Sequence, residues 1–352
     1  MQYVIGKPNP YKTDYLIGRF LEQGGAYFDF TGNITNILTR IPTERYNDLV
    51  LFTPDTEFPI GLNVLHNPQN IPHIANAVLE TIKSAYHYEG ATPLMDMYTY
   101  NSVAGLCYVP DATLLGIPFL LTDTDYRAKV IGHIKDPVLS YFWNDFYTSI
   151  PERDRRHDIM STLNKVFALI TDPTIRNIIG QKRTSFTVSD TSLIVASFPH
   201  SLGKEKASFL ATLLLYYLPD FPIVINDGHD LGHHSVLEKT QITFSHRYLQ
   251  QLTESMRETL IGMSDEIVCF RIGATDNLRL EREFEINRNV SNLTELAPDR
   301  YHMKGRIVEH DIKVLELPEP LFDPIKAMNY SREKNSSPRA HVEASIGKFF
   351  KS

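Results

Sequence analysis

The residues between Gly6 and Thr13 have the types and spacing of a loop that binds phosphate. They read Gly-Lys-Pro-Asn-Pro-Tyr-Lys-Thr, after the strand-like stretch QYVIG and before a helical pattern. In the pattern G-x-x-x-x-G-K-[ST], backbone N–H groups donate hydrogen bonds to the phosphates. The lysine binds a phosphate oxygen, and the hydroxyl of the Ser or Thr binds Mg²⁺. Gly6, Lys12 and Thr13 fit this pattern. They are therefore candidate nucleotide-binding residues, and the other interpretation of this stretch is a lysine at the start of a helix.

The elements that must position this loop predict a parallel sheet. Strand-like runs alternate with helical stretches on both sides of a long helical block, and this alternation is typical of parallel strands joined by crossover helices. The predicted strands are 2–6, 26–30, 48–52, 191–198, 221–225, 241–245 and 266–270, and the predicted helices between them are 12–23, 204–218 and 248–261.

The middle of the chain has helical periodicity without β-branched runs. Helices are predicted there at 71–88, 94–108, 123–149 and 155–171, separated by turns that contain proline. We therefore predict a first part of an α/β core over 1–66, an all-α insertion over 67–175, a second part of the core over 176–322, and a polar, basic C-terminal tail over 323–352. We expect this tail to be mobile or to dock on a partner.

The composition indicates a folded protein that does not coat nucleic acid. Hydrophobic residues make up 42% of the chain, charged residues 22%, and the net charge is −7, so any DNA contact needs a local basic patch. The two cysteines lie far apart in the sequence, which excludes a disulfide framework. Without a long apolar run or a signal peptide, we expect a cytoplasmic protein with no membrane span of its own, which partners could hold at the inner membrane.

Short segments spread over nearly the whole chain point to one family. They are DFTGN (29–33), IPTERYNDLVLFTPDTEFPIGLNVL (41–65), TLLGIPFLLTD (113–123), DPVLSYFW (136–143), NKV (164–166), IRNIIGQ (175–181), FRIGATD (270–276) and SREKNSSPRAHVE (331–343). In order and spacing they resemble the TraD-like conjugative coupling ATPases of type IV secretion systems, in the FtsK/HerA superfamily of motors. The resemblance implies a RecA-like P-loop NTPase core with helices on both faces of a mostly parallel sheet and an inserted all-α subdomain. It also implies ATP and Mg²⁺ as cofactors, DNA and secretion components as partners, and a hexamer.

The phosphate loop departs from the family pattern. Tyr11 stands where the family has the glycine before Lys12, at a point where the backbone passes close to phosphate. Pro8 and Pro10 each lack an N–H group, so two candidate phosphate donors are missing.

The second motif of the family, an Asp-Glu pair after a strand, is also altered. The Asp holds Mg²⁺ and the Glu polarises the attacking water. Here Asn226 and Asp227 follow the strand FPIVI, so one carboxylate is missing in either register, and Arg247 stands where the family has a sensor glutamine. Asn226 remains a candidate nucleotide-binding residue. Asp227 and Arg271, which matches a trans-acting or structural arginine of the family, are the candidate catalytic residues if the protein is active.

These departures predict a degenerate, catalytically inactive relative of the coupling ATPases, because loop, metal ligand, base and sensor act as a unit. We expect it to act in DNA transfer, translocation or packaging as a subunit that binds DNA or a partner, beside an intact ATPase relative or other secretion or packaging components, in a homo- or hetero-hexamer. The alternative is a divergent but active ATP-driven DNA translocase, in which Lys12, Thr13, Asp227 and Arg271 suffice.

A third hypothesis is a metal-dependent hydrolase. The second motif is followed by a cluster of imidazole and carboxylate groups, which suit Zn²⁺, Mn²⁺ or Fe²⁺. The cluster consists of Asp227, His229, Asp230, His233 and His234. The other interpretation of this stretch is a polar loop at the carboxyl end of a strand, where polar residues commonly collect.

Overall fold

The computed structural model describes residues 1–54, 57–86, 90–231, 239–284, 292–305, 311–314 and 321–351. The chain divides into two compact units, each built from three stretches. The first unit consists of Met1–Phe52, Val188–Ser201 and Pro219–Ser331, and the second consists of Thr53–Thr187, Leu202–Leu218 and Arg332–Ser352.

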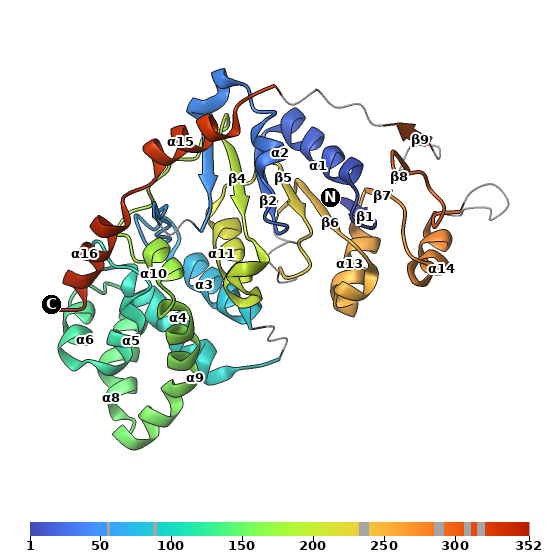
Figure 1. The fold of residues 1–352 in the computed structure, drawn as a ribbon. Coiled ribbons are helices and arrows are strands. Elements are labelled where there is room, and N and C mark those ends of the chain that lie inside the picture. The colour runs from blue at the N-terminus through green and yellow to red at the C-terminus, as the bar shows by residue number, and fades with distance from the viewer. Residues whose placement is uncertain are drawn as a thin grey trace. The chain divides into compact units, whose positions relative to one another are not determined.

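The first unit is built on one sheet (Figure 1). Within the described residues its strand order is β3-β4-β2-β5-β6-β1-β7-β8-β9. Neighbouring strands from β3 to β7 are parallel, whereas β8 runs antiparallel to β7 and β9 antiparallel to β8. The strands are β1 (Gln2–Ile5), β2 (Gly25–Asp29), β3 (Leu49–Phe52), β4 (Leu193–Ser197), β5 (Ile223–Asn226), β6 (Ile242–His246), β7 (Glu266–Cys269), β8 (Arg300–Gly305) and β9 (Asp311–Val314).

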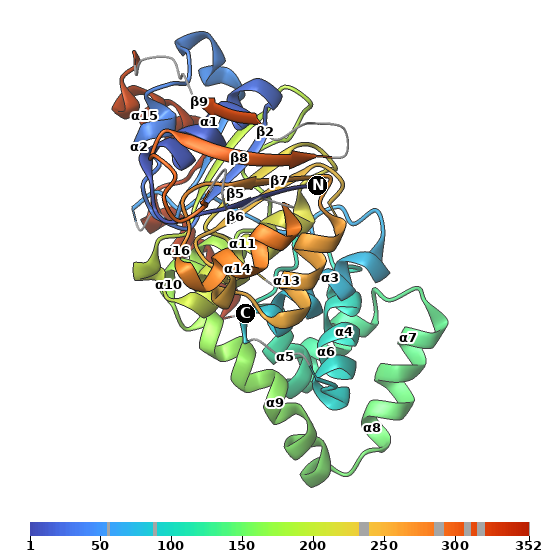
Figure 2. The ribbon, with the colours of Figure 1, turned by 90° about the vertical axis from the view of Figure 1, so that its right-hand side faces the viewer.

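Helices cover both faces of this sheet. Figure 2 shows α1 (Pro10–Gln23) and α2 (Thr35–Leu38) on one side, and α13 (Glu254–Met263) and α14 (Ala274–Glu283) on the other. Every residue of β1 to β6 is buried, as expected for parallel strands covered on both faces. The apolar side of α1, which includes Phe20, packs against strand residues such as Val4 and Tyr27.

Short 3₁₀ segments complete the first unit. They are Thr43–Asp48, His200–Leu202 and Leu249–Gln251. The last of these occupies the start of the helix predicted over 248–261, so the regular helix α13 begins later than predicted, after the Thr253 side chain accepts a hydrogen bond from the backbone of Met256.

The second unit is helical. Contacts join α3 to α11, α3 to α4, and α4 to α9. Its helices are α3 (Ile71–Ala85), α4 (Pro93–Leu106), α5 (Gly116–Thr122), α6 (Thr124–Ile131), α7 (Pro137–Tyr141), α8 (Tyr147–Ser149), α9 (Glu152–Ile170), α10 (Pro173–Ile179), α11 (Lys204–Tyr217) and α16 (Arg339–Phe349), while α15 (Pro324–Asn335) begins in the last stretch of the first unit. The predicted all-α insertion, 67–175, lies within this unit, and the division of the chain into the four predicted segments remains a prediction.

The single helix predicted over 123–149 is wrong. The structure has α6, then α7, then a π-helical turn over Phe142–Phe146, then α8. Pro137 starts α7, and the side chain of Asp136 caps it by accepting from the backbone N–H of Leu139. Proline lacks an N–H and clashes with the preceding turn of a helix, so it favours the first position of a new helix over the interior of a long one.

The C-terminal residues, expected to form a tail that is mobile or docks on a partner, form helices α15 and α16, and docking on a partner stays a prediction. In α16 the side chains of Val342 and Ile346 are buried one turn apart, and α16 packs beside α10 (Figure 1). Glu343 accepts hydrogen bonds from Asn177 and from Arg339. The many charged residues of this segment lie around a narrow apolar stripe, which explains why its composition resembles that of a tail.

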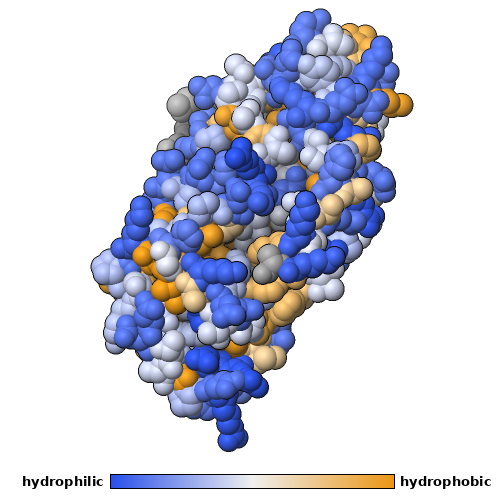
Figure 3. All heavy atoms as spheres, turned by 90° about the vertical axis from the view of Figure 1, so that its left-hand side faces the viewer, coloured by the Kyte–Doolittle hydropathy of each residue, from blue (hydrophilic) through white to orange (hydrophobic). Residues whose placement is uncertain are grey.

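The surface agrees with the composition of the chain. Figure 3 shows one face on which hydrophilic residues predominate and hydrophobic residues gather in small groups. Among the described residues, no helix combines the length and the apolar character needed to cross a membrane. Cys107 and Cys269 are buried free thiols.

Candidate functional site: a polar network at the sheet edge

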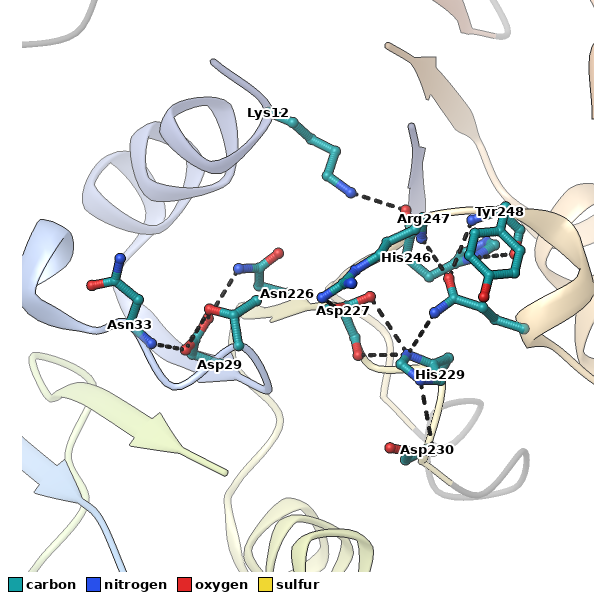
Figure 4. A network of polar contacts seen from close by, with 12 residues as sticks. Lys12, Asp29, Asn33, Asn226, Asp227, His229, Asp230, His246, Arg247 and Tyr248 are labelled. Carbon is teal, nitrogen blue, oxygen red and sulfur yellow. Dashed lines mark hydrogen bonds and ion pairs between the residues drawn. The ribbon is translucent and has the colours of Figure 1, made fainter. Parts of the chain in front are cut away.

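The candidate residues meet because the strands that carry them are neighbours in the sheet. The order β2-β5-β6-β1 is parallel throughout, so these four strands end at the same edge. Asp29 at the end of β2 is aligned with Asn226 at the end of β5, and Ile5 at the end of β1 with His246 at the end of β6. Figure 4 shows the polar network that these strand ends and the residues after them create.

Lys12 is buried and its ammonium group is held by backbone carbonyls. The side chain is 3% exposed, and Nζ donates to the carbonyl oxygen of Gly6 at 2.9 Å and to that of His246 at 3.0 Å. Burial lowers the pKa of Lys12 to about 8, although the charge of Asp227 acts in the opposite direction. The lysine of the predicted phosphate loop therefore already has two acceptors inside the protein.

Asp227 lies in an ion pair with Arg247. Its carboxylate is 2% exposed and lies 2.5 Å from the guanidinium of Arg247, which is one third exposed. Burial alone would raise the pKa of Asp227, but its contact with His229 and the charges of Arg247 and Lys12 outweigh burial and lower it. The residue has φ 65°, in the left-handed region that Asp tolerates better than most side chains. Arg247, which replaces the expected glutamine, thus neutralises the candidate catalytic carboxylate.

His229 extends this pair into the following turn. Its Nδ1 lies 3.5 Å from the carboxylate of Asp227, and its Nε2 lies 3.7 Å from that of Asp230. Burial alone would lower the pKa of His229, but these two carboxylates outweigh it and raise it. The Gln251 side chain lies 3.3 Å from His229 Nδ1 and accepts from the backbone N–H of Arg247. Gln251 was not predicted from the sequence, and no local pattern marks it.

Asp29 and Asn226 form a second hydrogen-bonded group in this network. Asn226 Nδ2 donates to Asp29 Oδ1 at 2.9 Å, the hydroxyl of Thr31 donates to the same carboxylate, and so does the backbone N–H of Asn33. Burial raises the pKa of Asp29, and these hydrogen bonds limit the rise. Asn226, predicted to contact nucleotide, here fixes the turn of the DFTGN segment.

The loop between β1 and α1 is held by contacts within the protein. A Cβ at Gly6 would lie 2.6 Å from Cβ of Phe270, so the neighbouring strand end explains this glycine. The backbone N–H of Lys7 donates to the carbonyl of Arg271. Asn9 caps α1 by accepting from the N–H of Tyr11 at 2.9 Å, and its amide donates to the carbonyl of Pro298 at 2.6 Å. These contacts give the loop a structural role without phosphate.

His246 links β6 to β1 through its ring. Nδ1 lies 3.1 Å from the carbonyl oxygen of Tyr248, which can only accept, so Nε2 accepts the hydrogen bond of the Tyr3 hydroxyl at 2.6 Å. Burial lowers the pKa of His246 to about 3, so the ring is neutral near pH 7. Tyr3 was not predicted as a site residue. The signal available in the sequence was the tyrosine hydroxyl within the predicted strand 2–6, because a buried hydroxyl needs a hydrogen-bond partner.

The other two candidates lie at the margin of this network. Thr13 Oγ1 is 3.5 Å from the carbonyl oxygen of Asn9, the residue that caps α1. Arg271 follows β7 and its side chain is exposed. Within the described residues, no contact joins that side chain to Lys12 or Asp227.

The metal hypothesis gains no support from the described residues. No three of their histidine, cysteine, aspartate or glutamate side chains converge in a way that could hold a metal ion. His229 contacts Asp227 and Asp230 as ion pairs, whereas His233 and His234 lie outside the described residues.

The chemistry of the network is that of a self-neutralised cluster. Lys12 has two carbonyl acceptors, Asp227 has Arg247 and His229, and Asp29 has three donors. Two of the three N–H groups of the Lys12 ammonium donate to these carbonyls, so an anion at Lys12 would have to compete for a buried group that already has internal acceptors.

The parallel sheet with helices on both of its faces and a helical block inserted after β3 is shared with solved structures of a conjugative coupling protein and of VirB4, so the predicted RecA-like fold is confirmed. The unbound bacterial conjugative coupling protein TrwBdeltaN70 is 9% identical, with a TM-score of 0.62 over 90% of this chain and 84% of that chain. TrwB in complex with ADP and Mg²⁺ is 10% identical, with a TM-score of 0.60 over 90% and 86%.

VirB4 of Thermoanaerobacter pseudethanolicus has the same fold, with 12% identity and a TM-score of 0.61 over 91% of each chain. No family model matches the sequence, and no curated protein matches it either. At these identities the likeness to TrwB and VirB4 concerns the fold.

Proposed function

We propose that the chain is a degenerate relative of the conjugative coupling ATPases that does not hydrolyse ATP. It serves a type IV secretion or DNA-transfer system by binding DNA or a protein partner, beside an ATPase that supplies the energy. The fold shared with TrwB and VirB4 over about nine tenths of the chain supports the connection to such systems.

The observation that carries the proposal is the state of Lys12. A lysine that binds phosphate directs its ammonium group toward the ligand. Lys12, in contrast, is 3% exposed, and its ammonium group donates hydrogen bonds to two backbone carbonyls. Around it, Pro8 and Pro10 offer no N–H, and Tyr11 stands in the position that needs glycine. Both the charge and the backbone donors of a phosphate site are thus compromised.

The second motif supports the same conclusion. The carboxylate of Asp227 is occupied by Arg247, a fixed cation where a metal-bound water would be needed. Asn226 has an amide where the family has a carboxylate, and this amide donates a hydrogen bond to Asp29. Because the parts of such a site act together, losing several of them removes far more activity than losing one.

The competing function is a divergent, active ATPase. One observation favours it: Lys12 and Asp227 lie at the same sheet edge, and the pKa of Asp227 is lowered, so the carboxylate is charged near pH 7. In that case ATP and Mg²⁺ would displace Arg247 from Asp227 and Lys12 from its carbonyls.

Repair of the two motifs tests the proposal. The wild type and the double variant Tyr11→Gly/Asn226→Asp are titrated with ATP and Mg²⁺ by isothermal titration calorimetry, with each single variant alongside and folding checked by circular dichroism. We expect no binding by the wild type and binding gained by the double variant, which Lys12→Met in the repaired chain abolishes. Equal binding by wild type and double variant would contradict the proposal.

A further inference from the structure

A second place with charged chemistry lies within the helical unit. It is a cavity of about 470 Å³ between the segment 180–185 and the first turns of α16. We refer to it as the Lys182 cavity. Its polar lining includes Asp111, Gln181, Lys182, Arg183, His341 and Ser345. Two of the segments singled out in the sequence, IRNIIGQ and SREKNSSPRAHVE, reach this cavity, and the network at the sheet edge gives them no role.

Cations outnumber carboxylates in the lining. Lys182 Nζ lies 3.3 Å from the carboxylate of Asp111, and both side chains are about half exposed, so this ion pair is weak. The Arg183 side chain is exposed, and within the described residues no carboxylate lies within ion-pair distance of it. His341 adds a ring nitrogen on the α16 side. The cavity therefore has a net positive lining with a guanidinium free to bind.

A buried scaffold fixes the backbone of this cation-bearing loop. The side chain of Asn63, 2% exposed, donates to the carbonyl of Lys182 at 2.8 Å and to that of Ala112 at 2.9 Å. The backbone N–H of Asn63 donates to the hydroxyl of Thr184 at 3.0 Å. A loop held in this way loses little further freedom when a ligand binds, and such preorganisation favours affinity.

The next residues of the loop are fixed as well. Ser185 Oγ accepts from the N–H of Gly61 at 2.8 Å and donates to the carbonyl of Asn335 at 2.5 Å. A Cβ at Gly61 would lie 2.9 Å from the carbonyl oxygen of Arg183, so the close approach of the two segments requires glycine there. Gly61 and Asn63, both in the FPIGLN stretch, thus act as supports for the cavity.

We propose that the Lys182 cavity binds the phosphate group of a small phosphorylated molecule. Arg183 offers the planar donor pair that recognises phosphate, and Lys182 adds a point charge. Val342 gives the lining an apolar side for the organic part of the ligand. The volume lies within the range of roughly 300–1,000 Å³ that is typical of small-molecule sites. This site is separate from the phosphate loop, so it goes beyond the proposed function.

The test uses the full chain and three probes: pyrophosphate, adenosine monophosphate and a single-stranded oligonucleotide, each titrated by calorimetry. The cavity variant is Lys182→Gln/Arg183→Gln. The matched control is Arg153→Gln/Arg156→Gln, which removes the same charge from the exposed start of α9 in the same unit. Melting temperatures verify that both variants fold.

We expect pyrophosphate and adenosine monophosphate to bind, with affinity at least tenfold weaker in the cavity variant and unchanged in the control. Lys12→Met should also leave it unchanged. No binding of either small probe, equal weakening in both variants, or binding of the oligonucleotide alone would overturn the assignment. Loss of binding in Lys12→Met alone would overturn it and the proposed function together, whereas absence of binding leaves the proposed function intact.

Discussion

The side chain of Lys12 illustrates how surroundings decide what a residue can do. Its spacing from Gly6 predicts a phosphate-binding lysine. The strand order, however, places β6 next to β1, so the carbonyl oxygen of His246 lies 3.0 Å from the ammonium group. Burial then lowers the pKa of Lys12 to about 8. A buried ammonium group with internal acceptors is a structural feature that also has a cost in stability.

That cost predicts how stability depends on pH. The pKa of Lys12 is about 8 in the folded protein against an ordinary 10.5, so the unfolded chain binds more protons between these values and stability rises with pH there. The gain amounts to about 3 kcal/mol by pH 10.5. Lys12→Met lacks this titration, so the difference in unfolding free energy between wild type and variant, from urea denaturation, should shift by this amount between pH 8 and 10.5. A difference that stays constant over this range would show that the ammonium group is solvated.

The pair of Asp227 and Arg247 gives a second prediction at this scale. A double-mutant cycle with Asp227→Asn and Arg247→Gln should yield a coupling energy of about 1–2 kcal/mol near pH 7, between the values of exposed and buried ion pairs. Asn tolerates the left-handed backbone as Asp does, so the cycle isolates the charge. The exposed pair of Arg156 and Glu152 on α9 serves as the control, with an expected coupling of at most about 0.5 kcal/mol. Equal couplings in the two cycles would contradict the burial of the Asp227 pair.

How far the site could be predicted depends on which contacts are local. Lys12, Asn226 and Asp227 are recognisable because each follows a buried strand in a known spacing. Their partners are not, because Arg247 meets Asp227 only through the pairing of β5 with β6, and pairing between strands is not encoded in a local pattern. Sequence alone therefore predicts which groups gather at the sheet edge, but not that they satisfy one another.

At the scale of elements, the start of α1 is set by a cap. Asn9 has extended backbone and accepts from the N–H of Tyr11, and Pro10 takes the first helical position. Both residues lie inside the predicted phosphate loop, so the loop is built as an ordinary helix N-terminus.

The cap predicts a stability effect that needs no nucleotide. Asn9→Ala should lower the unfolding free energy by about 1 kcal/mol, whereas Asn9→Ser, which keeps an oxygen that can accept from the N–H of Tyr11 and places no carboxylate beside the carbonyl of Pro298, should lower it less. Thermal denaturation of the three proteins in the absence of nucleotide measures this. If Asn9→Ala is as stable as the wild type, the loop is held by something other than its cap.

The strands and helices that the sequence predicts well are those with strong apolar patterns. The buried strands β1 to β6 appear as short apolar runs, and α1 as a one-sided helix. Strand β8, with the sequence RYHMKG, and the highly charged α14 were not predicted, because an antiparallel strand or a surface helix buries only part of its residues. For the same reason, α16 was predicted as part of a tail and not as a helix.

At the scale of the whole molecule, the chain has the fold of TrwB and VirB4, and the polar groups at the edge of its sheet are paired with one another. The fold of TrwB and VirB4 extends over about 90% of the chain at 9–12% identity. The fold is thus shared at low sequence identity. If the proposed function holds, the chain contributes binding surfaces to a transfer system and another subunit supplies the energy.

The measurement that tests this account most directly is ATP hydrolysis by the purified chain with Mg²⁺, with and without single-stranded DNA, beside Lys12→Met. The account predicts phosphate release no faster than that of Lys12→Met under either condition, because Lys12 and Asp227 are already occupied by internal partners. Hydrolysis by the wild type that Lys12→Met abolishes, in variant protein shown to be folded, would contradict it.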